Sequence, residues 1–175
     1  MRAMTTLVLT VIGNDRAGLV NALAETVADG GGNWEQSHLA ELAGTFAGLV
    51  VVTVPDARAD AMMAALRPLS GLLEITVHRG EDDSHAPAAG TALTIELIGN
   101  DHPGMVRDVS AVLAGHDVTI VELSSDTRQA PMAGGTLFEA TVCARTAAST
   151  DLAALRDDLE RLAGELLVDL TLSAD

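Results

Sequence analysis

Hydrophobic and polar residues alternate along two short stretches of the chain, one near its start and one near its middle. The apolar members are Leu7, Leu9 and Val11 in the first stretch and Leu93, Ile95 and Leu97 in the second. Alternation with a period of two is the pattern of a β-strand that buries one face. Each stretch therefore predicts a strand, and the constant offset of 86 residues indicates an internal repeat.

A polar turn follows each predicted strand at the same offset. It is Ile-Gly-Asn-Asp-Arg-Ala-Gly over residues 12–18 and Ile-Gly-Asn-Asp-His-Pro-Gly over residues 98–104. Apolar residues with helical spacing come next, and they predict amphipathic helices over residues 17–28 and 103–114. Strand, turn and helix thus occur twice.

The remaining patterns add three strands and a second helix to each repeat. In the first repeat we expect strands over residues 34–42, 46–54 and 73–78 and a helix, capped by Asp56, over residues 56–69. In the second we expect strands over residues 118–125, 136–144 and 166–172, a long hairpin connection over residues 126–135 and a helix over residues 152–162. The order βαββαβ predicts the α+β class, as two ferredoxin-like units with antiparallel four-stranded sheets and both helices on one face.

The length of the chain fits this duplication. Its 175 residues suit two domains of roughly 85 residues each. Residues 80–90 are polar and then small, without apolar periodicity, which is typical of a linker. We therefore expect a first domain over residues 1–80, a linker over residues 81–90 and a second domain over residues 91–175.

The repeated turn admits two interpretations. In the first, Asn or Asp caps the helix by accepting hydrogen bonds from its free amides, Pro103 takes the first helical position, and the turn has a structural role only. In the second, glycine lets a ligand approach the backbone, and the helix N-terminus binds an anion. An adjacent aspartate would then hold an ammonium group, so that both ends of a free amino acid find partners.

The second interpretation defines a set of candidate ligand-binding residues in the two turns and in the strands predicted to lie beside them. They are Asn14, Asp15, Arg16, Ala17, Gly18, Leu19, Asn33, Glu35, Asn100, Asp101, His102, Pro103, Gly104, Met105 and Glu122.

The charge of the chain argues against several classes of function. The net charge is -15, and all ten basic residues are arginines spread singly along both repeats. Because phosphate binding needs clustered basic residues, direct binding to nucleic acid or to an anionic membrane is disfavoured. The sequence contains neither a run of about 18 apolar residues nor a signal-peptide layout, which favours a soluble, cytoplasmic protein.

Signatures of catalysis and of metal binding are missing from the sequence. Cys143 is the only cysteine, and the five histidines show no ligand spacing. No nucleophile elbow and no phosphate-binding loop with its lysine occurs. We therefore expect no metal, no cofactor and no enzyme activity.

A turn of the type Gly-x-Asp-x-Pro-Gly after the first strand of a βαββαβ unit, complete at residues 99–104, resembles the ACT domain. Second strands that open on Asn-Trp-Glu-Gln-Ser at residues 33–37 and on Ile-Val-Glu-Leu at residues 120–123 extend the resemblance over essentially the whole chain. Ala17 departs from it, because the first turn then lacks the proline. The resemblance implies a regulatory module that binds amino acids at seams between neighbouring modules.

What the resemblance implies for function is an amino-acid-sensing regulator without enzyme activity. A ligand of the glycine or serine class and control of transcription or metabolism are the expectations. Because the acidic surface disfavours DNA, control would pass through a partner, either a regulator or an enzyme. The alternative is an interaction scaffold that binds no ligand and regulates a partner by contact.

The two predicted sheets differ on the face away from their helices. In the first repeat this face carries Val8 and Ile12, and residues 49–52 make both sides of a strand apolar. In the second repeat the corresponding strands carry Glu96 and Glu139. Strands that are apolar on both faces are normally buried on both. We expect the outer face of the first sheet to be covered by the other repeat or by a second chain in a homodimer, and that of the second sheet to be more exposed to water.

Overall fold

A computed structural model describes residues 3–80, 90–130 and 134–174 of the chain. These residues form two compact units, one within residues 1–85 and the other within residues 86–175, which are named here domain 1 and domain 2. The predicted linker lies almost entirely outside the described residues, which resume at Gly90.

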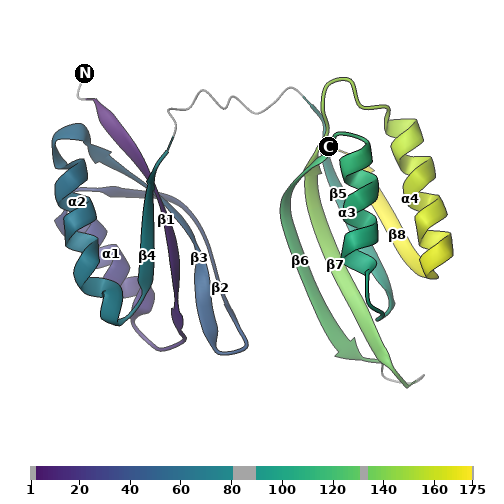
Figure 1. The fold of residues 1–175 in the computed structure, drawn as a ribbon, viewed down its shortest axis with the longest axis horizontal. Coiled ribbons are helices and arrows are strands. Elements are labelled where there is room, and N and C mark those ends of the chain that lie inside the picture. Colours follow the sequence, from purple (N-terminus) through teal and green to yellow (C-terminus); the bar gives the residue numbers. More distant parts are fainter. Residues whose placement is uncertain (1–2, 81–89, 131–133, 175) are drawn as a thin grey trace. The chain divides into compact units, whose positions relative to one another are not determined.

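Both domains have the βαββαβ order that the sequence predicts (Figure 1). Domain 1 consists of β1 (Met4–Asn14), α1 (Leu19–Asp29), β2 (Asn33–Leu42), β3 (Thr45–Pro55), η1 (Asp56–Arg58), α2 (Ala59–Leu66), η2 (Arg67–Gly71) and β4 (Glu74–Arg79). Domain 2 consists of β5 (Ala92–Asn100), α3 (Met105–Gly115), β6 (Thr119–Gln129), β7 (Thr136–Arg145), α4 (Leu152–Leu166) and β8 (Val168–Ala174).

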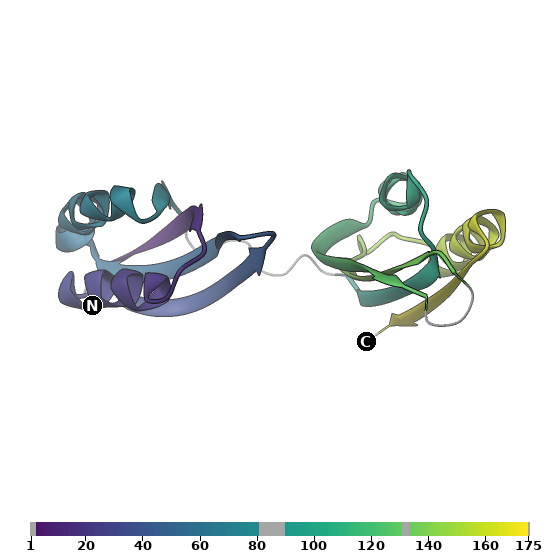
Figure 2. The ribbon, with the colours of Figure 1, turned by 90° about the horizontal axis from the view of Figure 1, so that it is seen from below.

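Each domain has one antiparallel four-stranded sheet. The strand orders are β2-β3-β1-β4 and β6-β7-β5-β8, so that the first strand of each domain lies in the interior of its sheet. The two helices of a domain lie on the same face of its sheet (Figure 2). The predicted α+β class and ferredoxin-like arrangement are confirmed.

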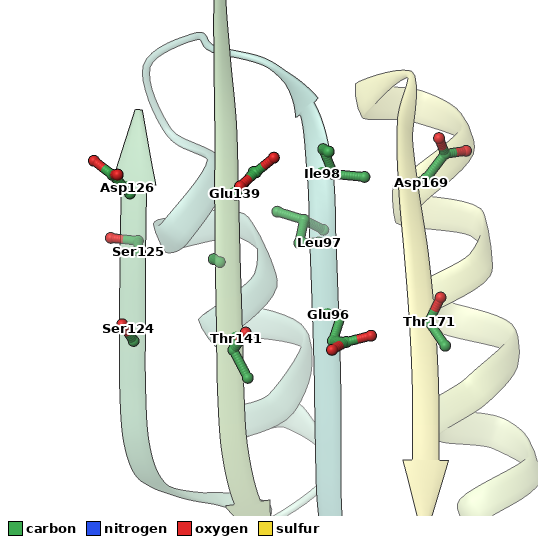
Figure 3. Close-up of a pocket in the computed structure, with 11 residues that line it drawn as sticks. Glu96, Leu97, Ile98, Ser124, Ser125, Asp126, Glu139, Thr141, Asp169 and Thr171 are labelled. Carbon is green, nitrogen blue, oxygen red and sulfur yellow. The ribbon is translucent and has the colours of Figure 1, made fainter. Parts of the chain in front are cut away.

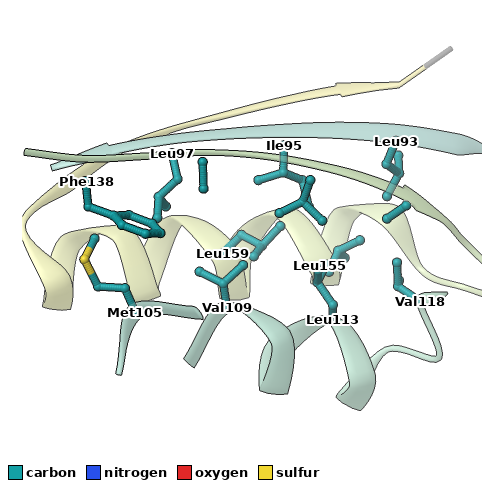
Figure 4. Packing of buried hydrophobic residues seen from close by; sticks show 13 residues of the cluster. Leu93, Ile95, Leu97, Met105, Val109, Leu113, Val118, Phe138, Leu155 and Leu159 are labelled. Atoms are coloured by element: carbon teal, nitrogen blue, oxygen red, sulfur yellow. The ribbon is translucent and has the colours of Figure 1, made fainter. Parts of the chain in front are cut away.

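The alternating residues that predicted the first strands form the centre of each core. Leu7, Leu9 and Val11 are fully buried against α1 and α2 in domain 1. In domain 2 the equivalent side chains pack on α3 and α4, where Leu113 and Leu159 are fully buried (Figure 4). Full burial of a side chain of this size stabilises the fold by about 1.5–3 kcal/mol. Each domain therefore has a hydrophobic core of its own.

Two elements differ from their predicted form. Strand β6 extends to Gln129, so residues 126–129 pair with residues 136–139 of β7 instead of forming a connection. The helix predicted over residues 56–69 consists of η1, α2 and η2 in succession, with Pro68 at the start of η2. Asp56 does not cap it: its carboxylate accepts a hydrogen bond from Thr5 Oγ1 at 2.7 Å, and α2 has no side-chain cap.

Candidate ligand-binding site

Both repeated turns end on a glycine in the left-handed conformation. Gly18 has a φ of 92° and Gly104 a φ of 102°, and each is the N-cap residue of the helix that follows it. This conformation costs an L-residue about 1–2 kcal/mol, which explains glycine at this place in both turns. The prediction that Pro103 takes the first helical position is wrong, because Pro103 precedes the N-cap residue.

The helices that follow the turns begin without a side-chain cap. In the described residues, no side chain accepts a hydrogen bond from the first amides of α1 or α3, so capping by Asn or Asp of the turn is not observed. Helix α4 provides the contrast, because the Asp151 carboxylate accepts from the amides of Ala153 and Ala154 at 3.0 and 3.1 Å. The first amides of α1 and α3, at the positive end of the helix dipole, thus have no side-chain acceptor.

The backbone of each turn is fixed by the neighbouring hairpin. The Asp15 amide donates to the Gly44 carbonyl at 2.9 Å, and the Asp101 amide donates to the Thr136 carbonyl at 2.8 Å. Both aspartate side chains are exposed. Each turn therefore presents an exposed carboxylate four residues before the first residue of a helix.

The first glycine of each motif serves the packing of the protein and not the approach of a ligand. A Cβ atom on Gly13 would lie 2.6 Å from the carbonyl oxygen of Leu72, and one on Gly99 would collide with the side chain of Val168. These contacts come from the segments that lead into or begin the last strand of each domain. The expectation that glycine here opens the backbone to a ligand does not hold for Gly13 and Gly99.

The two turns differ in their electrostatic surroundings. Arg107 Nε donates to Asp108 Oδ1 at 2.7 Å in the first turn of α3. This hydrogen bond holds the pKa of Asp108 below its usual value, and the nearby His102 acts in the same direction. Domain 1 has Asn21 and Ala22 at the matching positions. An anion at the start of α3 would thus meet an ion pair that the start of α1 lacks.

Asn33 and Glu35 contact each other at the beginning of β2. Glu35 Oε1 accepts hydrogen bonds from Thr53 Oγ1 at 2.7 Å and from Asn33 Nδ2 at 2.8 Å. These two bonds, that of Thr53 first, hold the pKa of Glu35 below its usual value. In domain 2, Glu122 lies opposite Cys143 and is exposed.

The structure does not bring these strand residues next to the turn of their own domain. Asn33 pairs with Thr53, and Thr53 pairs with Thr6 near the start of β1, whereas the turn follows Asn14 at its end. Eight residues of strand separate the two places by roughly 27 Å at about 3.4 Å per residue. The reason is the strand order: β2 and β1 both run antiparallel to β3, so they share a direction and begin at the same end of the sheet.

The other candidates divide by burial. Exposed residues of the turns are Asn14, Asp15, Arg16, Ala17, Gly18, Asn100, Asp101 and Pro103, while His102 and Gly104 are half-buried. Leu19 and Met105 are buried in the two cores, so at a site they would contribute backbone amides only. Sequence reasoning did not single out Arg107 and Asp108. The only signal for them was their position directly after the second motif.

A separate depression lies on domain 2, on the sheet face opposite α3 and α4. Its side chains include Glu96, Glu139, Asp169 and Thr171, which all project from this face (Figure 3). It is strongly acidic and contains none of the candidate residues. In the described part of the chain, no group of three or more His, Cys, Asp and Glu side chains is placed to hold a metal ion, and no helix is long and apolar enough to cross a membrane.

Known proteins resemble the chain along nearly its whole length. The glycine cleavage system transcriptional repressors of Escherichia coli (strain K12) and Shigella flexneri are each 26% identical to it over 162 residues, which cover 91% of this chain and 85% of each relative. A crystal structure of an unknown protein from Galdieria sulphuraria matches with a TM-score of 0.88 at 28% identity, covering 99% of both chains.

A crystal structure described as a putative glycine cleavage system transcriptional repressor matches with a TM-score of 0.68 at 20% identity and covers 98% of both chains. At that identity the likeness shows the fold. The model of the ACT domain matches residues 5–79 and again residues 91–173. Since these two matches account for most of domain 1 and of domain 2, the chain belongs to the ACT domain family and is a tandem pair of ACT domains related to that repressor.

Proposed function

We propose that this protein senses a small amino acid and passes that state to a protein partner that controls transcription or metabolism. One observation carries the proposal: α1 and α3 both begin without a side-chain cap, each four residues after an exposed aspartate whose backbone amide is hydrogen-bonded to the neighbouring hairpin. The free amides suit a carboxylate, and Asp15 or Asp101 suits an ammonium group. Free amino acids carry both groups.

The class of ligand follows from the relatives. Their name refers to glycine cleavage, so we propose glycine, serine or a similarly small amino acid. The turns are the primary candidates. Asn33, Glu35 and Glu122 form a second group of candidates at the other end of their sheets, separate from the turns of their own domains.

We propose that regulation is indirect and that the protein is not an enzyme. A chain with a net charge of -15 repels the phosphates of DNA, so a protein partner is favoured as the direct target. Ligand binding would shift the equilibrium between two states with a coupling free energy of typically 1–3 kcal/mol. We place this activity in the cytoplasm.

A scaffold that binds no ligand is the second candidate. Apolar side chains exposed on the outer sheet face of domain 1, Ile12 and Leu49 among them, favour it, because such residues commonly mark a protein contact. The two candidate functions predict different behaviour: a sensor binds a free amino acid, whereas a scaffold does not.

A thermal-shift panel of the twenty amino acids tests the proposal. A ligand that binds only the native state stabilises it by roughly 2.7 kcal/mol at a hundredfold excess over Kd. We expect one or two small amino acids to raise the Tm and the others to leave it unchanged. No response to any amino acid would favour the scaffold.

Two variants locate the site. Asp15→Ala and Asp101→Ala remove a carboxylate from a turn whose backbone contact uses only the amide, so the fold should persist while affinity falls about tenfold or more in the turn that binds. Asp29→Ala, at the far end of α1, is the matched control. Unchanged affinity in both turn variants would exclude these carboxylates from binding.

A further inference from the structure

The sheet face of domain 1 that points away from α1 and α2 is largely apolar. Its central residues alternate with the buried residues of β1 and β3. We call it the domain-1 face, and it comprises Val8, Thr10, Ile12, Gln36, His38, Ala40, Leu42, Ala47, Leu49, Val51, Glu74, Thr76 and His78. Ile12 is 43% exposed and Leu49 50% exposed. No helix of domain 1 covers this face (Figure 2).

Domain 2 has the same backbone with different chemistry on the corresponding face. This domain-2 face comprises Thr94, Glu96, Ile98, Glu122, Ser124, Asp126, Arg128, Glu139, Thr141, Cys143, Asp169, Thr171 and Ser173. By strand register, Glu96 matches Thr10, and Thr141 matches Leu49. Since domain 2 forms this sheet with polar residues, the fold does not require apolar residues there. Folding of the sheet therefore does not explain why the corresponding residues of the domain-1 face are apolar.

The centre of the domain-1 face has neighbouring short, uncharged side chains. Val51 lies opposite Val8, and Leu49 lies opposite Thr10 across the two central strands. In the next row Ile12 lies between Ala47 on β3 and Glu74 on the edge strand β4. A surface of this kind can approach a second sheet to the usual separation of about 10 Å, because no long charged side chain stands at its centre.

Charge excludes the domain-2 face as the surface that covers it. Glu96, Glu122, Asp126, Glu139 and Asp169 give the domain-2 face five carboxylates (Figure 3 shows all but Glu122), whereas Arg128 is its one basic residue and pairs with Glu139. Packing valine and leucine on this face would remove carboxylates from water without giving them partners. Two domain-1 faces meet with less of that penalty, because each carries a single carboxylate, Glu74 on the edge strand β4, and its centre is uncharged.

The size of the domain-1 face suits a second copy of the chain. Over the whole sheet, whose strands have 11, 10, 11 and 6 residues, four strands about 4.8 Å apart and an average of about eight residue steps of about 3.4 Å give roughly 500 Å² in projection. A pair of such faces would bury roughly 1,000 Å², which reaches the size expected of a specific interface. Contact between identical patches is also the usual geometry of a twofold dimer.

We propose that the domain-1 face packs against the same face of a second copy, forming an isologous homodimer in which two four-stranded sheets make a sandwich. The proposal concerns assembly and does not depend on amino-acid sensing. It assigns Val8, Leu49 and Val51 to the dimer contact and leaves the domain-2 face in water.

Sedimentation equilibrium on the full chain tests the proposal with variants that exchange residues between matched positions. The chain of 18.0 kDa should sediment as a dimer of twice that mass. Thr10→Glu introduces the residue that domain 2 has at Glu96, and Leu49→Thr the residue that it has at Thr141. Each should weaken dimerisation at least about tenfold, because an unpaired charge or a lost apolar contact enters the interface.

Thr141→Glu is the matched control, because it adds a charge at the position of the domain-2 face that corresponds to Leu49. This variant should remain dimeric. Circular dichroism reports the fold, and if Thr10→Glu does not fold, Leu49→Thr decides alone. A monomeric wild-type chain, a dimer that both domain-1 variants leave intact, or equal loss of the dimer in Thr141→Glu would each overturn the proposal.

Discussion

Gly104 determines where α3 begins, because its φ of 102° suits glycine and strains other residues. Gly104→Ala should therefore destabilise domain 2 by about 1–2 kcal/mol in urea unfolding. A Cβ atom added to Gly115, at the other end of the same helix, would meet open space, and the φ of Gly115 is not positive. Gly115→Ala should be neutral or slightly stabilising, and an equal loss in both variants would show that the turn conformation is not the cause.

At this scale the sequence identified the turn but not its conformation. The motif places Asn and Asp shortly before a helix, which is also the pattern of an ordinary cap, and only the left-handed Gly18 and Gly104 show that the helices begin later. Arg107 and Asp108 were missed for a related reason. A charged pair on the first turn of a helix is indistinguishable in sequence from a solvated surface until its hydrogen bond is seen.

The central strands were predictable as elements, because alternation between a buried and an exposed face is a strong signal in β1 and β5. The end of β6 was not. It is an edge strand whose residues 121–129 are all exposed, so no apolar alternation marks residues 126–129 as strand. Their pairing with β7 depends on backbone hydrogen bonds, which any polar sequence can supply.

A polar contact joins the C-cap residue of α3 to α4 and predicts a pH dependence. His116 Nε2 donates to Asp158 Oδ2 at 2.8 Å, and this bond, with a smaller effect of Arg161, holds the pKa of Asp158 below its usual value of 3.8. A carboxyl whose pKa is lowered by folding adds stability above its unfolded pKa, and this stability is lost as the pH falls through the folded value. Asp158→Asn should thus lower the Tm of domain 2 at pH 7.

The difference in Tm between Asp158→Asn and the wild type should shrink as the pH falls below about 3.8. Asp157→Asn removes the same charge from the exposed residue that directly precedes Asp158 in α4, and it serves as the control. A difference in Tm that persists unchanged at acid pH, or that Asp157→Asn reproduces, would contradict the assignment to this contact.

Across the whole molecule, the internal repeat allows the fold to be predicted from the sequence, but it does not reveal how the two domains differ in function. The offset of 86 residues predicts two equal units, and the two sheets do share one strand order. Yet the chemistry of the units diverges: Leu49 matches Thr141 on the outer faces, and Asn21 matches Arg107 beside the turns. Residues that the two repeats share can be interpreted from the sequence, because they recur. The role of residues that differ between the repeats depends on which side chains surround them, and this is known only from the structure.

Because each domain has its own core, the unfolding of each domain can be measured separately. Trp34 is the only tryptophan, and it packs against the core of domain 1. Its fluorescence should follow the unfolding of domain 1, while circular dichroism follows both domains. Leu159 is fully buried in domain 2, so Leu159→Ala should cost about 2–5 kcal/mol there and leave the fluorescence transition in place. Leu9→Ala should instead shift the fluorescence transition. A shift of that transition in Leu159→Ala would show that the domains unfold together.

Protein concentration should then affect the two transitions differently. Association through the domain-1 face stabilises only the domain that forms the contact, because binding to the native state shifts unfolding by mass action. Raising the concentration should raise the temperature of the Trp34 transition in the wild type and have little effect on the transition of domain 2. In Leu49→Thr the Trp34 transition should no longer depend on concentration, whereas in Thr141→Glu it should. If both transitions rise together in the wild type, domain 2 takes part in the contact as well.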